Sequence, residues 1–130
     1  IEEGAGSGQT DGYLTREEIL KVFEKIDCDV DFFKTLLEKY KSSAGELWNK
    51  IKESIARKDG AALRGYAHTL KGEFLIFNAT GPVKTAAFLE EAGRTENFDG
   101  VDRAAMELEE HIRRIVDSCT AFLNQEERND

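Results

Sequence analysis

The sequence has little of what builds β-sheets, membrane spans or disulfide frameworks. Only one proline occurs in 130 residues, and no stretch alternates regularly between apolar and polar side chains, which argues against a sheet. No apolar run approaches the ~20 residues that cross a bilayer, and no signal-peptide pattern opens the chain. Cys28 and Cys119 have neither metal-ligand spacing nor a partner motif, which favours free thiols in a reducing cytoplasm. We therefore expect a helical, cytoplasmic domain that makes no membrane contact of its own.

An excess of acidic over basic residues gives the chain a formal net charge of −8. Nucleic-acid binding requires clustered lysine and arginine, so it is not expected. Residues 1–13 are mostly small and polar, and the chain begins with Ile1 rather than methionine. We interpret 1–13 as a flexible linker of a longer protein or a tag remnant, and 125–130 as a disordered tail. Residues 14–124 are expected to form one domain.

Apolar residues recur at helical spacing in five segments of this domain. The first and shortest begins with a capping box formed by Thr15 and Glu18. The other four are predicted over about 31–58, from Asp59-Gly60 to near Asn78, from Thr80-Gly81-Pro82 to Gly93, and after a cap at Asp99. Short connections make successive helices antiparallel. The predicted fold is all-α, an up-and-down antiparallel four-helix bundle with a short N-terminal helix capping one end.

One histidine in the third helix points the wrong way for a core residue. The apolar stripe of that helix consists of Leu63, Ala67, Leu70, Phe74 and Phe77. His68 projects roughly 140° away from the start of this stripe, toward solvent. Gly65 and Gly72 share the outward face, although each costs up to ~1 kcal/mol relative to alanine. Leu75 and Ile76 add exposed apolar area. Close approach by another macromolecule would explain these choices.

An exposed imidazole is a nucleophile near neutral pH and carries a phosphoryl group on nitrogen. Lys71 lies one turn beyond His68 and about 60° around the helix, where an ammonium offsets the charge of a transferring phosphoryl group. On the next helix, Glu90 interrupts an apolar stripe. Glu90 is expected either to accept a hydrogen bond from His68, which would fix the ring tautomer, or to pair with Arg94 at i,i+4. Both alternatives stay open at the level of sequence.

The run His68-Thr69-Leu70-Lys71-Gly72, in the third of five helices of an acidic bundle, resembles the histidine phosphotransfer (HPt) domains of bacterial phosphorelays. The resemblance covers about residues 14–124. It implies that His68 accepts a phosphoryl group from a receiver-domain aspartate and passes it to another receiver. Lys71 and Gly72 match the family's usual companions, and Glu90 stands where many members carry Gln or Glu. Arg94 stands where some members place a basic residue.

One departure concerns the segment after the motif. The family commonly continues with small residues, whereas this chain has the bulkier Glu73-Phe74-Leu75-Ile76-Phe77, which bears on partner identity. The resemblance implies a phosphocarrier that is not itself an enzyme, from the cytoplasmic part of a hybrid sensor histidine kinase. An acidic bundle with one short apolar patch is expected to be a monomer. Its partners would be response-regulator receiver domains; the domain would hold no cofactor or metal, and Mg²⁺ would sit on the receiver. We assign His68, Lys71 and Glu90 to the phosphoryl chemistry and the following to partner binding: Gly65, Gly72, Leu75, Ile76 and Arg94.

Two other functions are compatible with the same predicted fold. The chain could be the amino-terminal phosphoacceptor module of a chemotaxis-type kinase, or an interaction bundle that is never phosphorylated. A di-iron bundle requires glutamate three residues before each histidine. Gly65 precedes His68 and Leu108 precedes His111 at that spacing, which argues against it. His111 falls at the edge of the last apolar stripe and is interpreted as a boundary residue.

Overall fold

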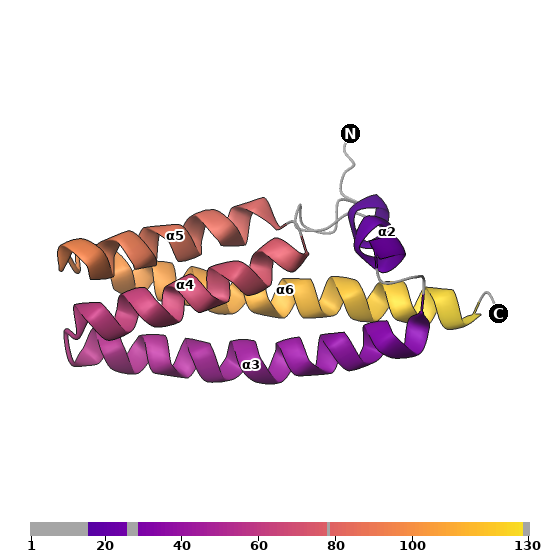
Figure 1. Cartoon of the computed structure of the whole chain (residues 1–130), viewed down its shortest axis with the longest axis horizontal. Helices are drawn as coiled ribbons and strands as arrows, with labels where there is room; N and C mark the ends of the chain where they lie inside the picture. Colours follow the sequence, from indigo (N-terminus) through magenta and orange to yellow (C-terminus); the bar gives the residue numbers. More distant parts are fainter. Residues whose placement is uncertain (1–15, 26–28, 78, 129–130) are drawn as a thin grey trace.

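The computed structural model describes residues 16–25, 29–77 and 79–128, and five α-helices make up most of them. Their bounds are α2 Arg16–Lys25, α3 Val30–Ala56, α4 Gly60–Ile76, α5 Thr80–Thr95 and α6 Val101–Arg128. Helices α3 to α6 run alternately in opposite directions, and α2 lies over the end where α3 and α6 extend past the other two (Figure 1). The predicted four-helix bundle with a short N-terminal helix is confirmed.

Aspartates begin two of the long helices. Asp29 precedes α3 and accepts a hydrogen bond from the Phe32 backbone N–H at 3.0 Å. Asp59 precedes α4 and accepts one from the Ala62 N–H at 3.1 Å, as the predicted break at Asp59-Gly60 implied. Each carboxylate satisfies an amide that the first helical turn leaves without a backbone partner. Thr15 lies outside the described residues, so its capping box stays a prediction.

Gly93 was predicted to end α5, and this prediction is wrong. The helix continues to Thr95, and Glu96 then adopts the left-handed conformation with φ of 56°. Gly93 is buried inside the helix instead. A Cβ atom added to it would lie 2.5 Å from the Gly60 carbonyl oxygen and 2.6 Å from the Arg64 amide nitrogen. The absence of a side chain therefore lets α5 pack directly against the backbone of α4.

Two boundaries of α6 also differ from expectation. Gly100, rather than Asp99, directly precedes the helix, with a positive φ of 75°, and its carbonyl accepts a hydrogen bond from the Ala104 N–H at 3.1 Å. At the other end the helix continues through Arg128, so a disordered tail from 125 is wrong for residues 125–128. Glutamine, glutamate and arginine form helices well, and no glycine or proline interrupts them. Residues 129–130 and 1–13 lie outside the described residues.

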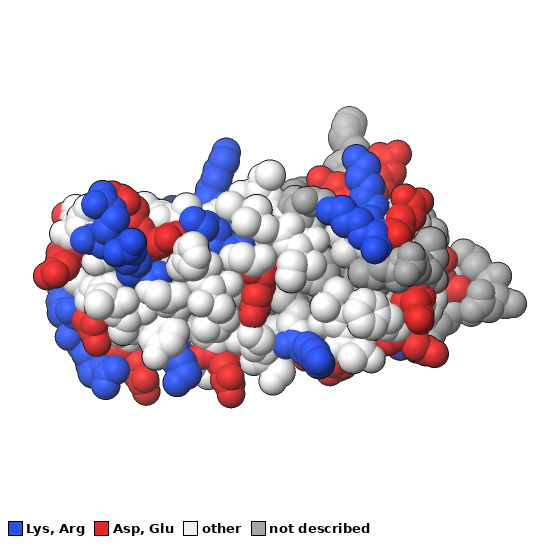
Figure 2. Space-filling model, in the orientation of Figure 1, with Lys and Arg blue, Asp and Glu red and all other residues white. Residues whose placement is uncertain are grey.

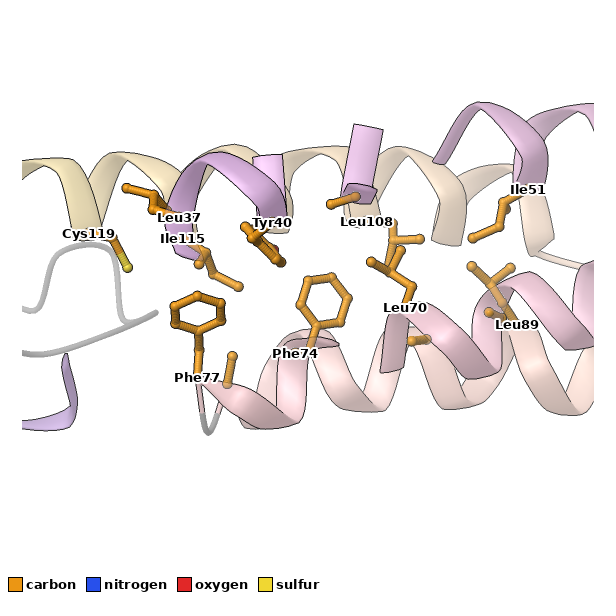
Figure 3. Close-up of a cluster of buried hydrophobic side chains, with 14 of the residues drawn as sticks. Leu37, Tyr40, Ile51, Leu70, Phe74, Phe77, Leu89, Leu108, Ile115 and Cys119 are labelled. Atoms are coloured by element: carbon orange, nitrogen blue, oxygen red, sulfur yellow. The ribbon is translucent and has the colours of Figure 1, made fainter. Parts of the chain in front are cut away.

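The core runs along the inside of the bundle and is rich in aromatic rings. Tyr40 packs edge-on against Phe74 and Phe77, with ring centroids 6.4 and 5.0 Å apart, and these rings lie between the helices (Figure 3). A second cluster joins Phe23 of α2 to the ends of α3 and α6 through Phe33 and Phe122. The predicted stripe of α4 is fully buried from its first leucine to its last phenylalanine.

Other sequence expectations concern single side chains. Trp48 was expected in the core; it is partly buried and donates its indole N–H to the Ala105 carbonyl at 2.8 Å. Cys119 is a free thiol, and burial raises its pKa to about 12; Cys28 lies outside the described residues. None of the described helices combines the length and the apolarity that a membrane crossing requires.

Candidate functional site

The outward face of α4 presents His68 to solvent. Its side chain is 67% exposed. A Cβ atom added to Gly65 or Gly72 would meet no neighbouring atom within 4 Å, so packing inside this chain does not require either glycine. Leu75 and Ile76 are 55% and 49% exposed, although both are large and apolar. The outward position predicted for these five residues is confirmed.

Glu90 of α5 connects His68 to Lys71. One carboxylate oxygen, Oε2, lies 2.9 Å from His68 Nδ1, and the other, Oε1, lies 2.6 Å from Lys71 Nζ. The hydrogen bond from Lys71, followed by the one from His68, lowers the pKa of Glu90. Arg94 does not compete for this carboxylate, because it pairs with Glu91, its Nε lying 2.9 Å from Oε1. The sequence left open whether Glu90 bonds to His68 or pairs with Arg94, and in the structure it bonds to His68.

The close packing at Gly93 explains how Glu90 reaches the ring. Gly93 touches the backbone of α4 at Gly60 and Arg64, which lies one turn before His68. Because α4 and α5 are antiparallel, the residue one turn before Gly93 faces the residue one turn after Arg64. Glu90 and His68 occupy these positions. The glycine that was predicted to end a helix thus brings the carboxylate to the imidazole.

The carboxylate also selects the tautomer of His68. An ionised Glu90 only accepts hydrogen bonds, so Nδ1 must carry the hydrogen that lies between them. In the neutral ring the lone pair then belongs to Nε2. Since the side chain is largely exposed, this nitrogen is available to an electrophile brought by another molecule.

A shallow hollow of about 300 Å³ borders the ring, and its lining residues are Ala61, Arg64, Gly65, His68 and Glu90. It lies on the side of His68 nearer the start of α4, because its other α4 lining residues all precede the histidine. Gly72 and Lys71 do not line it. Sequence reasoning did not single out Arg64, although its position four residues before His68 places the two on adjacent turns of one face.

Residues 73–77, which replace the small residues common in the family, are divided between the core and the surface. Phe74 and Phe77 are buried, whereas the neighbouring Leu75 and Ile76 are exposed. Glu73 is half-buried at the contact with α3 and accepts a hydrogen bond from the Ser43 hydroxyl. Burial raises the pKa of Glu73. The bulky phenylalanines therefore pack in the core, and the leucine and isoleucine lie on the surface about two turns beyond His68.

On the face drawn in Figure 2, acidic and basic side chains are spread rather than gathered in one place, with uncharged surface between them. Within 16–25, 29–77 and 79–128, no group of three or more His, Cys, Asp and Glu side chains is arranged as a metal site.

An antiparallel four-helix bundle that exposes one histidine beside a carboxylate is the architecture of a protein that presents an imidazole to a partner. The Hpt domain family matches residues 35–120, and the chain belongs to this family, which mediates histidine phosphotransfer in phosphorelays. In fold the chain is similar to histidine-containing phosphotransfer protein B (HptB) from Pseudomonas aeruginosa PAO1. That crystal structure matches with a TM-score of 0.73 and 21% identity, over 89% of this chain and 96% of the other. No curated protein sequence matches the chain.

Proposed function

We propose that Nε2 of His68 accepts a phosphoryl group from the aspartyl phosphate of one receiver domain and delivers it to the aspartate of another. The observation that supports this most directly is the 2.9 Å contact between Nδ1 and Glu90 on a ring that is 67% exposed. This contact engages Nδ1 and leaves Nε2 without a hydrogen bond to Glu90. The half-buried His111 has no comparable access to a partner.

In the forward step the Nε2 lone pair attacks phosphorus in line. The Nε2–P bond forms as the bond from phosphorus to the aspartate oxygen breaks, and the receiver carboxylate leaves. The ring becomes an imidazolium with its hydrogen still on Nδ1, and Glu90 stabilises that positive charge. The reverse sequence, with a second receiver aspartate as the nucleophile, discharges the histidine.

The surrounding residues have separate tasks in this scheme. Lys71 holds Glu90 in its ionised form and supplies positive charge next to the ring. Gly65 and Gly72 leave room for the receiver to approach, and Leu75 and Ile76 provide apolar contact area beside the histidine. We place Arg94 at the rim of this surface, where it would meet acidic groups of the partner.

The domain in this proposal carries the phosphoryl group without turning over a substrate of its own. Mg²⁺ and the acidic pocket that activates the aspartate would come from the receiver. The complex would be transient, with an interface below ~1,200 Å². We propose that the domain works as a monomer in the cytoplasm and does not bind nucleic acid or membrane.

Labelled receiver domains test the proposal. Receivers are phosphorylated with acetyl phosphate and Mg²⁺, freed of excess donor and mixed with the wild-type chain, His68→Gln or His111→Gln. We expect acid-labile label on the wild type and on His111→Gln, and none on His68→Gln. Label that persists on His68→Gln would contradict the assignment. Absence of label from all three, with receivers that discharge to another HPt domain, would favour a bundle used only for interaction.

A further inference from the structure

The two cations that the sequence assigned to this site already have partners. Lys71 lies 2.6 Å from Glu90, so the pair carries no net charge. Arg94 forms an ion pair with Glu91 on its own helix. A phosphoryl group on His68 brings close to two negative charges to the α4 face. Both cations are thus already engaged by carboxylates before that charge arrives, which leaves room for a further cation at the site.

Arg64 is such a cation. Its side chain is exposed, and among the residues that the structure describes it forms no ion pair. Its field extends to Glu91, whose pKa is lowered by the hydrogen bond from Arg94 first and to a smaller extent by Arg64. Arg64 and Glu90 of α5 line the same hollow, so the arginine lies on the α5 side of the site, and its fork of N–H donors is not taken up by a carboxylate.

The position of Arg64 suits a group attached to His68. It lies one turn before His68 and about 40° around the helix, on the same side of the ring as Lys71. It lines the 300 Å³ hollow together with the histidine, and the hollow's other α4 residues, Ala61 and Gly65, are small. A Cβ atom added to Gly93 would lie 2.6 Å from the Arg64 amide nitrogen, so α5 packs closely against this turn of α4.

We propose that Arg64 is a binding residue for the phosphoryl group on His68, and that the hollow between them is where that group is held. The guanidinium would donate two parallel N–H bonds to phosphoryl oxygens, a geometry that arginine provides and lysine does not. This inference rests on the proposed function, because it requires that His68 be phosphorylated.

Phosphoramidate separates phosphoryl binding from receiver docking, because this small donor needs no partner protein. Nε2 of His68 forms its bond to phosphorus as the P–N bond of the donor breaks, and the donor nitrogen leaves as ammonia. The wild type is compared with Arg64→Gln, with Arg64→Lys, and with Arg103→Gln as a matched control. Arg103 lies on α6, is 88% exposed and pairs with Glu107 on its own helix.

We expect Arg64→Gln to slow phosphorylation by phosphoramidate at least about tenfold, with an unaltered thermal midpoint. Arg64→Lys should fall between it and the wild type, because charge is kept while the two-pronged contact is lost. Arg103→Gln should match the wild type. In ³¹P spectra, the phosphohistidine signal should shift in Arg64→Gln and stay in place in Arg103→Gln.

Two results would overturn the assignment of Arg64. One is a rate for Arg64→Gln equal to that of the wild type with phosphoramidate. The other is a defect seen only with phosphorylated receivers, which would make Arg64 a docking residue. A wild type that neither donor phosphorylates is a different result, since it would remove the proposed function itself.

Discussion

The two histidines of this chain occupy opposite environments in one bundle. His68 on α4 is largely exposed, and its Nδ1 bonds to the carboxylate of Glu90. His111 on α6 is half-buried against α5, with Nε2 lying 3.2 Å from the Thr85 hydroxyl oxygen, and burial lowers its pKa. The boundary position predicted for His111 is thereby confirmed.

The difference shows that neighbours and solvent, rather than residue type, decide what a histidine does. A phosphoryl group on His111 would bring its charge into a partly apolar seam, where a charged group without close partners is costly. On His68 the same charge stays in contact with water. A carboxylate beside His68 also stabilises the imidazolium that phosphorylation produces, which a neutral hydroxyl does less well.

The largest effect is expected from removing the open space around His68. Gly72→Gln places a long side chain on the docking face, and we expect transfer from a receiver to fall at least about a hundredfold, or 2.7 kcal/mol. Stability should move the other way, because replacing a helical glycine stabilises by about 0.5–1 kcal/mol where the new side chain has room. Transfer kinetics and urea unfolding measure the two effects.

Gly45→Gln is the matched control for that experiment. Gly45 lies in α3, and a Cβ atom added to it also meets nothing within 4 Å. The control should gain similar stability and keep its transfer rate. A folded Gly72→Gln variant that transfers at the normal rate would show that the docking face does not need its glycine.

A smaller effect should follow from giving His68 a neutral partner like that of His111. Glu90→Gln keeps a hydrogen-bond acceptor but removes the charge, whereas Glu90→Ala removes both. We expect phosphorylation to slow about tenfold in Glu90→Ala and less in Glu90→Gln, since orientation and charge each contribute part of the stabilisation. Rates with phosphoramidate measure this without a receiver. Unchanged rates in Glu90→Ala would mean that the carboxylate only stabilises the fold.

The smallest effect concerns His111 and pH. Burial lowers its pKa in the folded state below the ordinary value of 6.5, so the unfolded chain binds more protons as pH falls through that value. The stabilisation from His111 is therefore complete above about pH 6.5 and decreases on acidification. Urea unfolding of the wild type and His111→Gln at pH 7.5 and 5.5 measures it.

The His111→Gln variant should lose less stability between these two pH values than the wild type does. The difference belongs to His111 even though Glu107, Glu110 and Arg114 also act on its charge, because both proteins contain those groups. His68→Gln, in which His111 is intact, should lose as much stability on acidification through His111 as the wild type does. Equal pH slopes in wild type and His111→Gln would show that the ring titrates alike in the folded and unfolded chains.

Apolar periodicity predicted the helices well because burial on one side repeats every three or four residues. The same pattern predicted that His68, Gly65 and Gly72 face outward. Sequence patterns failed where one residue type has two structural roles. Glycine ends helices and also permits close helix packing. Gly93 was predicted to end α5, whereas in the structure it lies inside the helix and packs against α4. The end of α6 was missed because residues 125–128 have good helix propensity without an apolar stripe.

The order of residues by itself determined which face of α4 is bare, since about 100° of rotation per residue sets the direction of every side chain from its neighbours along the chain. Only the tertiary structure decided that Glu90 bonds to His68 instead of Arg94, and that Arg64 shares a hollow with the ring. Those facts depend on how closely two helices approach and in what register. That distance is determined by Gly93 against Gly60, a contact between residues 33 positions apart that no local pattern encodes.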